Sequence, residues 1–218
     1  MVIDVLINSC ARPDILDVSI NTFLYRILSS HDARFIIIED KVEDEERQVK
    51  GREYIESRND LFDKIVYLDK KAGPGFFFAP AVAECKSDFF FHLEDDNEFI
   101  QDIYIDPIIS LMEKNEDVVE VMMSRGSINP INNPRKTTID GVKVTEFDLF
   151  SVATGLFNTN SVRKMLDKIG WDKQLHEAGT LTPMSKKLGL RKFILGHDEQ
   201  HYVHVGAEKG YRKGGWRK

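Results

Sequence analysis

Three consecutive carboxylates, Glu94, Asp95 and Asp96, stand directly after the most apolar segment of the chain. That segment, residues 89–93, reads F-F-F-H-L, and a short apolar run bounded by polar residues is typical of a strand buried on both faces. Three acids at the end of a strand repel one another, and a hard divalent cation would resolve that conflict. Mg²⁺ and Mn²⁺ take oxygen ligands and reach a phosphate-bearing substrate through one or two protein carboxylates. The alternative is an acidic turn in which Asp96 or Asn97 caps the next helix.

The composition is that of an ordinary soluble globular chain. Its 218 residues fit one domain, or one domain with an appendage, and they are enough to bury a substantial core. Hydrophobic residues make up 42% and charged residues 30%. The net charge of −6 argues against a protein that chiefly binds nucleic acid, so we expect no nucleic-acid partner.

The two cysteines, Cys10 and Cys85, indicate reduced thiols in a reducing compartment, because they form neither a C-x-x-C pair nor a disulfide framework. The chain begins directly with an apolar run at residues 2–7, without the basic leader of a signal peptide. No apolar run approaches the roughly 18 residues of a transmembrane helix. We therefore expect a cytoplasmic protein, unless this is a soluble domain of a longer chain.

The first half of the chain alternates between short apolar runs and helical patterns. Strands are expected at residues 2–7, 34–40, 65–68 and 89–93, with helices beginning at Pro13 and covering residues 41–58 and 76–86. Charge dominates residues 41–58, which indicates a solvated surface helix. Strands and helices that alternate at this spacing indicate βαβ units, and therefore an α/β fold with a mainly parallel sheet.

Polar side chains follow each of these expected strands. Arg12, Asp40 and Lys71 come after the first three strands, and the acidic group at residues 94–96 comes after the fourth. In open α/β sheets ligands sit beyond the carboxyl ends of the strands. We therefore expect these residues to meet at one edge of the sheet.

The second half has a different pattern. Its expected elements are strands at 118–123 and 202–205, helices at 161–169 and 182–188, a polar loop at 124–134 and a weakly alternating stretch at 142–150. Residues 207–218 combine glycines with basic residues, a composition too flexible and too charged for a core element. They form either a disordered end or a segment that closes over a bound phosphate group. No internal repeat or linker divides the chain, so a single domain is expected.

The order of these features resembles the GT-A glycosyltransferases, metal-dependent enzymes that use a nucleotide-sugar donor. In that family one strand ends in a polar loop, a second ends in an acidic pair, and a small-residue helix precedes an apolar strand with the so-called DXD motif. The corresponding segments are N-S-C-A-R-P at 8–13, I-I-I-E-D at 36–40, A-P-A-V-A-E-C at 79–85 and L-E-D-D at 93–96. Each motif is weak alone, and their order and spacing are the specific signal.

The resemblance covers residues 2–206 and implies a GT-A, Rossmann-like three-layer sandwich, in which helices flank a mainly parallel central sheet. The Glu-Asp-Asp variant resembles that of the N-acetylglucosaminyltransferase branch, and residues 153–166 resemble the segment that closes over donor and acceptor in family 2-like members. In size the chain also resembles the compact glycosyltransferase domains of large algal viruses. The resemblance implies that residues 1–100 bind the nucleotide and residues 101–206 the acceptor, followed by the flexible basic tail at 207–218.

The resemblance also assigns a metal site. Asp96 would bind the metal directly, and His204 in V-H-V-G matches a histidine that supplies a further ligand in many members. An imidazole suits Mn²⁺ better than Mg²⁺, so Mn²⁺ is the expected cofactor and Mg²⁺ the alternative. Apart from the family, His204 reads as an ordinary strand histidine.

The expected nucleotide-binding residues follow from the same matches. They are Cys10, Arg12, Glu39, Asp40, Lys71, Glu94 and Asp95. Glu94 or Asp95 would approach the ribose or a metal-bound water, and Asp40, or Glu39 beside it, would accept a hydrogen bond from the uracil ring.

The general base is where the match to the family loosens. Inverting members place an acid on a short helix before the last strand, and W-D-K-Q-L-H-E-A at 171–178 puts Glu177 there, although alanine stands where an aspartate usually follows. Asp172 and Asp198 are the other candidates. Such an acid accelerates attack by removing the proton of the acceptor hydroxyl. A retaining mechanism is the alternative if none of these acids faces the sugar carbon.

The resemblance implies transfer of a sugar from a UDP-sugar to a hydroxyl of a glycan or glycoconjugate acceptor, with inversion. A sugar nucleotidyltransferase would share the sheet and the metal, but it needs a glycine-rich phosphate loop after the first strand. This chain has no glycine before Gly51. A domain that binds nucleotide sugars without catalysis is the other alternative, and the clustered acids with His204 favour a working metal site instead.

Overall fold

The computed structural model describes residues 1–126 and 134–205. Its strands are β1 (Val2–Ser9), β2 (Ile27–Leu28), β3 (Asp32–Glu39), β4 (Lys64–Tyr67), β5 (Phe89–Glu94), β6 (Asn97–Phe99), β7 (Ile103–Tyr104), β8 (Val118–Met122), β9 (Arg135–Ile139), β10 (Val142–Glu146), β11 (Gly155–Asn158), β12 (Arg191–Leu195) and β13 (Tyr202–His204). Its helices are α1 (Pro13–Arg26), α2 (Glu45–Ser57), α3 (Pro74–Glu84), α4 (Asp106–Lys114), α5 (Thr159–Ile169) and α6 (Thr182–Lys187), with a π-helical turn η1 (Glu177–Leu181).

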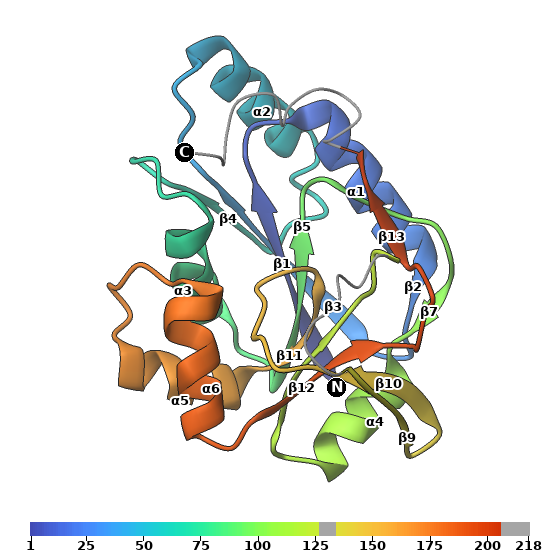
Figure 1. Cartoon of the computed structure of the whole chain (residues 1–218). Coiled ribbons are helices and arrows are strands. Elements are labelled where there is room, and N and C mark those ends of the chain that lie inside the picture. Colours follow the sequence, from blue (N-terminus) through green and yellow to red (C-terminus); the bar gives the residue numbers. More distant parts are fainter. Residues whose placement is uncertain (127–133, 206–218) are drawn as a thin grey trace.

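A nine-stranded sheet in the order β4-β3-β1-β5-β11-β8-β12-β10-β9 runs through the molecule (Figure 1). Its first four strands are parallel, which confirms the βαβ prediction for the N-terminal half. Beyond β5 the sheet is mixed, because β11 runs antiparallel to β5 and β8, while β12 runs parallel to β8. The carboxyl ends of β1, β3, β4 and β5 therefore share one edge.

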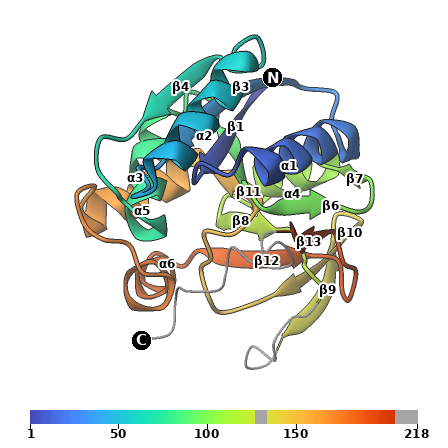
Figure 2. The ribbon, with the colours of Figure 1, turned by 90° about the horizontal axis from the view of Figure 1, so that it is seen from above.

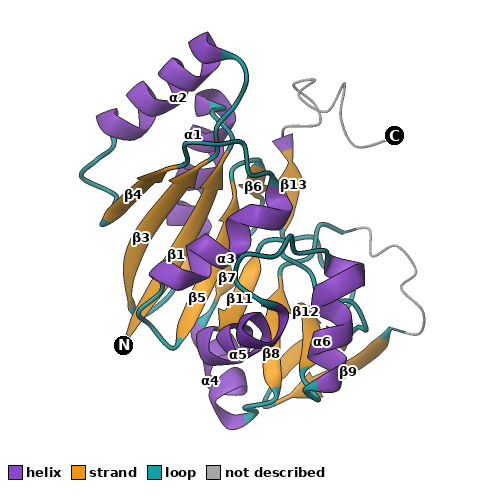
Figure 3. Cartoon of the chain, turned by 90° about the vertical axis from the view of Figure 1, so that its left-hand side faces the viewer, coloured by secondary structure: helices purple, strands orange, loops and turns teal. Residues whose placement is uncertain are grey.

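Helices cover both faces of this sheet, so the fold has three layers (Figure 3). Side chains of α1, α2 and α4 join one apolar cluster, and those of α3, α5 and η1 join the other. Figure 2, viewed from above, places α3 and α5 on one side of the sheet and α1 and α4 on the other. Strand β5 contributes side chains to both clusters. The ring centroids of Phe91 and Phe23 are 5.0 Å apart, and on the opposite face the stacked rings of Phe90 and Phe157 also have centroids 5.0 Å apart.

The apolar runs and helical stripes of the sequence correspond to real elements, but several elements were not predicted. These are helix α4 and strands β2, β6, β7, β9, β11 and β12. The expected solvated helix is α2, and it is not solvated on every side, because Gln48, Gly51 and Ile55 are buried. The predicted last strand, β13, lies outside the main sheet and pairs antiparallel with β6.

An ion pair between the buried Asp4 and the partly exposed Arg34 stabilises the start of β1. Asp4 is fully buried and accepts hydrogen bonds from Arg34 Nε at 2.6 Å and from the Ser87 amide at 2.9 Å. Burial alone would raise the pKa of Asp4, but the bonds from Arg34 and the amides outweigh it and lower that pKa. The pair contributes stability above the ordinary pKa of an aspartate, and that stability is lost as the pH falls.

We therefore expect Asp4→Asn to lower the free energy of unfolding at neutral pH by about 2 kcal/mol, since it leaves the partly buried Arg34 guanidinium without its carboxylate. Urea denaturation checks this. The difference from wild type should shrink as the pH falls below about 5. A difference that stays constant down to acid pH would show that the charge of Asp4 is not what stabilises β1.

Among the helices of the described ranges, none has the length and apolar composition needed to cross a membrane.

Candidate active site

Glu94, Asp96 and His204 come together at the carboxyl end of β5. The antiparallel pairing of β13 with β6 sets His204 opposite Asn97, and the Val205 amide donates to the carbonyl oxygen of Asp96 at 2.9 Å. His204 Nδ1 lies 3.3 Å from Asp96 Oδ1. One oxygen of each carboxylate and one ring nitrogen lie within 4.8 Å of one another, so the three side chains could hold a single metal ion.

The electrostatics of this cluster favour a cation. Burial, followed by the charge of Asp96, raises the pKa of Glu94 to about 7, and His204 only partly opposes this. Two acids held this close in a buried site cost free energy unless positive charge is added. Two carboxylates and an imidazole are a donor set that suits Mn²⁺. The residues therefore fit the expected ion.

Asp95, the middle acid, faces the loop after β1 instead. Its carboxylate accepts a hydrogen bond from the Cys10 amide at 2.8 Å and two from the Arg12 guanidinium, one of them from Nε at 3.2 Å. Arg12 Nη1 also lies 3.5 Å from Asp96 Oδ2. The predicted residues Cys10, Arg12, Asp95 and Asp96 thus belong to one connected group that joins β1 to the metal cluster.

The ends of β3 and β4 form the adjoining part of the edge. Asp40 accepts hydrogen bonds from the amides of Ala72 and Gly73, at 2.7 and 2.9 Å, and so fixes the loop after β4. Glu39 is buried against Gln48, and burial raises its pKa to about 7. Lys71 is exposed on the same loop, with Nζ 3.1 Å from Glu43.

Several contacts of the metal cluster were not predicted. The Thr154 hydroxyl accepts hydrogen bonds from the Glu94 amide, at 3.2 Å, and from the Asn97 side chain. One step deeper, His92 is held between the Asn8 amide group and the Ala153 carbonyl, at 2.6 and 3.3 Å. The one signal for this set is the A-T-G-L segment that starts at residue 153, for which the resemblance implies a segment that closes over donor and acceptor.

Arg125, which follows β8, was also missed. Its Nη1 lies 3.4 Å from His204 Nε2, on the side of the imidazole opposite to Asp96. Most of the loop predicted at 124–134 and the basic tail at 207–218 fall outside the described residues.

Glu177, the first candidate for the general base, lies on η1 and faces the segment before β11. Its Oε1 accepts hydrogen bonds from Ser151 Oγ and from the Val152 amide, both at 2.7 Å. The same segment continues to Thr154, which contacts the metal cluster. Glu177 is therefore joined to the cluster through one short stretch of chain.

The other two candidates lie elsewhere. Asp172 is in the exposed turn after α5. Asp198 lies in the turn between β12 and β13 and pairs with Lys136 of the edge strand β9, at 2.6 and 2.8 Å. Of the three acids, Glu177 is the one that hydrogen bonds to the segment leading to Thr154.

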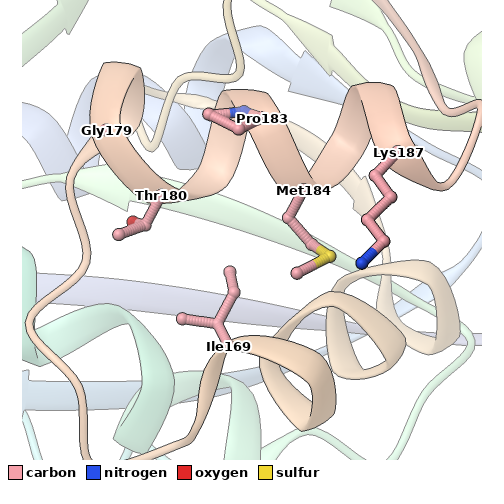
Figure 4. Close-up of a pocket in the computed structure, with 6 residues that line it drawn as sticks. All are labelled: Ile169, Gly179, Thr180, Pro183, Met184 and Lys187. Carbon is pink, nitrogen blue, oxygen red and sulfur yellow. The ribbon is translucent and has the colours of Figure 1, made fainter.

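A shallow groove of about 290 Å³ lies between α5 and the η1–α6 segment (Figure 4). Its lining residues are Ile169, Gly179, Thr180, Pro183, Met184 and Lys187. Ile169 and Met184 point toward one another across it (Figure 4). The groove is mostly apolar and contains none of the predicted site residues.

Comparison with known proteins identifies the fold. No family model and no curated protein matches the chain. Among solved structures, GalNAc-T7 with UDP, GalNAc and Mn²⁺ is 13% identical and matches 92% of this chain and 44% of its own, with a TM-score of 0.64. The chain has the GT-A fold.

Two further structures agree. The mannosyltransferase PcManGT from Pyrobaculum calidifontis, in complex with GDP-Man and Mn²⁺, is 13% identical and matches 96% of this chain and 58% of its own, with a TM-score of 0.60. S. aureus TarS 1–349 in complex with UDP is 12% identical and matches 93% of this chain and 60% of its own, also with a TM-score of 0.60. The GT-A fold is thus confirmed, and this chain spans about 60% of the TarS fragment's length.

Proposed function

We propose that this protein is a metal-dependent glycosyltransferase that moves a sugar from a UDP-sugar to a hydroxyl of a glycan or glycoconjugate acceptor, with inversion. The observation that carries the proposal is the Glu94–Asp96–His204 cluster at the carboxyl edge of the parallel strands. That edge is where open α/β sheets bind their ligands. Neighbours of the same fold were solved with UDP, UDP-GlcNAc and GDP-Man, two of them with Mn²⁺.

In this proposal different residues of the chain bind different parts of the donor. Asp96 and His204 hold the ion, which when bound supplies Lewis-acid stabilisation of the charge on the leaving diphosphate. Glu94 offers the ion a further carboxylate oxygen, and Arg12 adds a fixed positive charge beside Asp96. Asp40, at the end of β3, receives the uracil ring, since the side chain of Glu39 beside it is fully buried.

Glu177 is the proposed base for the acceptor. Its two hydrogen bonds to Ser151 and Val152 orient the carboxylate on the segment that leads to Thr154. A fixed carboxylate beside the acceptor hydroxyl takes its proton as the new glycosidic bond forms. In this proposal Glu177 acts on the acceptor and does not bind the nucleotide.

We expect Asp40→Asn to weaken UDP binding about tenfold or more, because the new NH₂ group cannot accept the bond that the Ala72 or Gly73 amide donates, and the loop beside the proposed uracil site loosens. Glu177→Gln should bind UDP with nearly wild-type affinity but lose about 10² in turnover. Isothermal titration with UDP and a turnover assay on both variants check this division. Equal loss of UDP affinity in the two variants would contradict it.

The function itself is tested with a panel of nucleotide sugars in the presence of Mn²⁺. A ligand that binds only the native state raises the melting temperature, so the correct donor should stabilise the protein in a metal-dependent way. Slow release of the nucleoside diphosphate from that donor without acceptor would separate an enzyme from a binding domain. Stabilisation without any release would favour the binding domain, and stabilisation by a nucleoside triphosphate alone would favour a nucleotidyltransferase.

A further inference from the structure

Helix α2 reaches the loop after β1 through one arginine. Arg47 donates from Nε to the carbonyl oxygen of Ala11 at 2.8 Å and from Nη2 to that of Cys10. Two consecutive main-chain carbonyls are thus held by one planar guanidinium, whose fork geometry suits paired acceptors. This use of α2 is not that of a solvated surface helix.

The loop that Arg47 holds has an unfavourable backbone conformation. Ala11 is fully buried and has a φ of 53°, in the left-handed region that residues with a Cβ atom avoid. Gly51 lets α2 approach, because a Cβ atom there would lie 2.8 Å from Ala11 Cα. Such a conformation persists only where its surroundings hold it, and Arg47 is in contact with both carbonyls around it.

The opposite side of the same loop holds the acidic turn. The Cys10 amide and the Arg12 guanidinium bind Asp95, and Arg12 also lies beside Asp96. A continuous series of hydrogen bonds therefore runs from Arg47 through residues 10–12 to Asp95. The ion pair of Arg12 continues it to Asp96, the proposed metal ligand.

We propose that Arg47 is a positioning residue of the active site: it holds the Cys10–Arg12 loop in its left-handed conformation, and this loop aligns Asp95 and Asp96. The inference rests on the proposed function, because the aligned group is the proposed metal site. Groups that hydrogen bond to metal ligands typically change metal affinity by 10- to 100-fold when they are replaced, and Arg47 acts one step further away, through the Cys10–Arg12 loop.

Two readouts test the proposal on the full chain. In Arg47→Ala, hydrogen exchange of the Cys10 amide, measured without metal, should speed up about tenfold, because the loop that presents it to Asp95 loosens. Mn²⁺ affinity, measured from the electron paramagnetic resonance signal of free Mn²⁺, should fall about tenfold. Lys50→Ala, an exposed replacement one turn further along α2, should change neither value.

A second replacement separates positioning from general support of α2. Glycine adopts a positive φ without penalty, so adding Ala11→Gly to Arg47→Ala should restore most of the Mn²⁺ affinity. A lower melting temperature with wild-type exchange and wild-type Mn²⁺ affinity would overturn the inference and leave Arg47 as a residue that only stabilises α2. If wild type itself binds no Mn²⁺, the proposed function fails, and the exchange rate of the Cys10 amide still decides whether Arg47 holds the loop.

Discussion

Asp96→Asn should lower metal-dependent turnover of the nucleotide sugar by about 10³-fold, because it removes the carboxylate at the centre of the proposed metal cluster. Asparagine keeps the size of the side chain but carries no charge. The melting temperature of the metal-free protein should change little, since the lost pairs with His204 and Arg12 are offset by relief of the repulsion between Asp96 and Glu94. A coupled enzymatic assay for the released nucleoside diphosphate, with a thermal melt on the same sample, checks both statements.

The matched control for this variant is Asp102→Asn. Asp102 is an exposed acid paired with Arg26 on the surface, so its loss should alter neither turnover nor Mn²⁺ affinity. Wild-type turnover in Asp96→Asn would show that the proposed metal cluster does not belong to the active site.

Arg12→Ala should lower the free energy of unfolding by about 3–5 kcal/mol. The Asp95 side chain is 4% exposed and that of Arg12 is 14% exposed, so removing Arg12 leaves a buried carboxylate without its counter-charge. Urea denaturation at neutral pH measures this loss. The large value comes from the stranded charge rather than from the worth of the pair itself.

The double variant Arg12→Ala with Asp95→Ala tests that origin. It should be more stable than Arg12→Ala alone, because no unpaired charge stays behind. Arg26→Ala, which breaks an exposed pair with Asp102 and an exposed contact with the Tyr25 ring, should leave the free energy of unfolding close to wild type. Additive losses in the double variant would mean that Arg12 stabilises the chain by packing and not through Asp95.

The parallel half of the sheet could be predicted because its strands are buried on both faces. Strands of this kind read as continuous apolar runs, as I-I-I at 36–38 and F-F-F at 89–91 do. Acids and bases directly after such runs must collect at one edge, so the grouping of Arg12, Asp40 and residues 94–96 followed from local pattern alone.

Strands β11 and β12 of the other half lack such a signal, unlike β8, which the apolar run at 118–123 predicted. In β12 the buried Lys192 donates to Ser185 Oγ at 3.0 Å, a contact that no local pattern reveals. In β11 Gly155 is required because a Cβ atom would lie 2.8 Å from the backbone of β8, and a single glycine reads as a break in a strand. These strands are formed by tertiary contacts rather than by their own apolar pattern.

The different partners of the three neighbouring acids could also not be predicted from the sequence pattern. Asp95 pairs with a residue 83 positions away, and His204 reaches Asp96 from 108 positions away through the β6–β13 pairing. Without the resemblance to a family, three neighbouring acids give no reason for the middle one to face a different partner. For the same reason α2 was read as a charged surface, although Arg47 and Gln48 face inward to the loop after β1 and to Glu39.

The central claim is that Glu94, Asp96 and His204 hold a metal ion that binds the diphosphate of the donor. It is tested most directly by titrating UDP into wild type and Asp96→Asn, each with Mn²⁺ and with a chelator. We expect Mn²⁺ to tighten UDP binding by about tenfold or more in wild type and to have no effect in Asp96→Asn. UDP affinity that is the same with Mn²⁺ and with chelator in wild type, or an equal gain in the variant, would contradict the account.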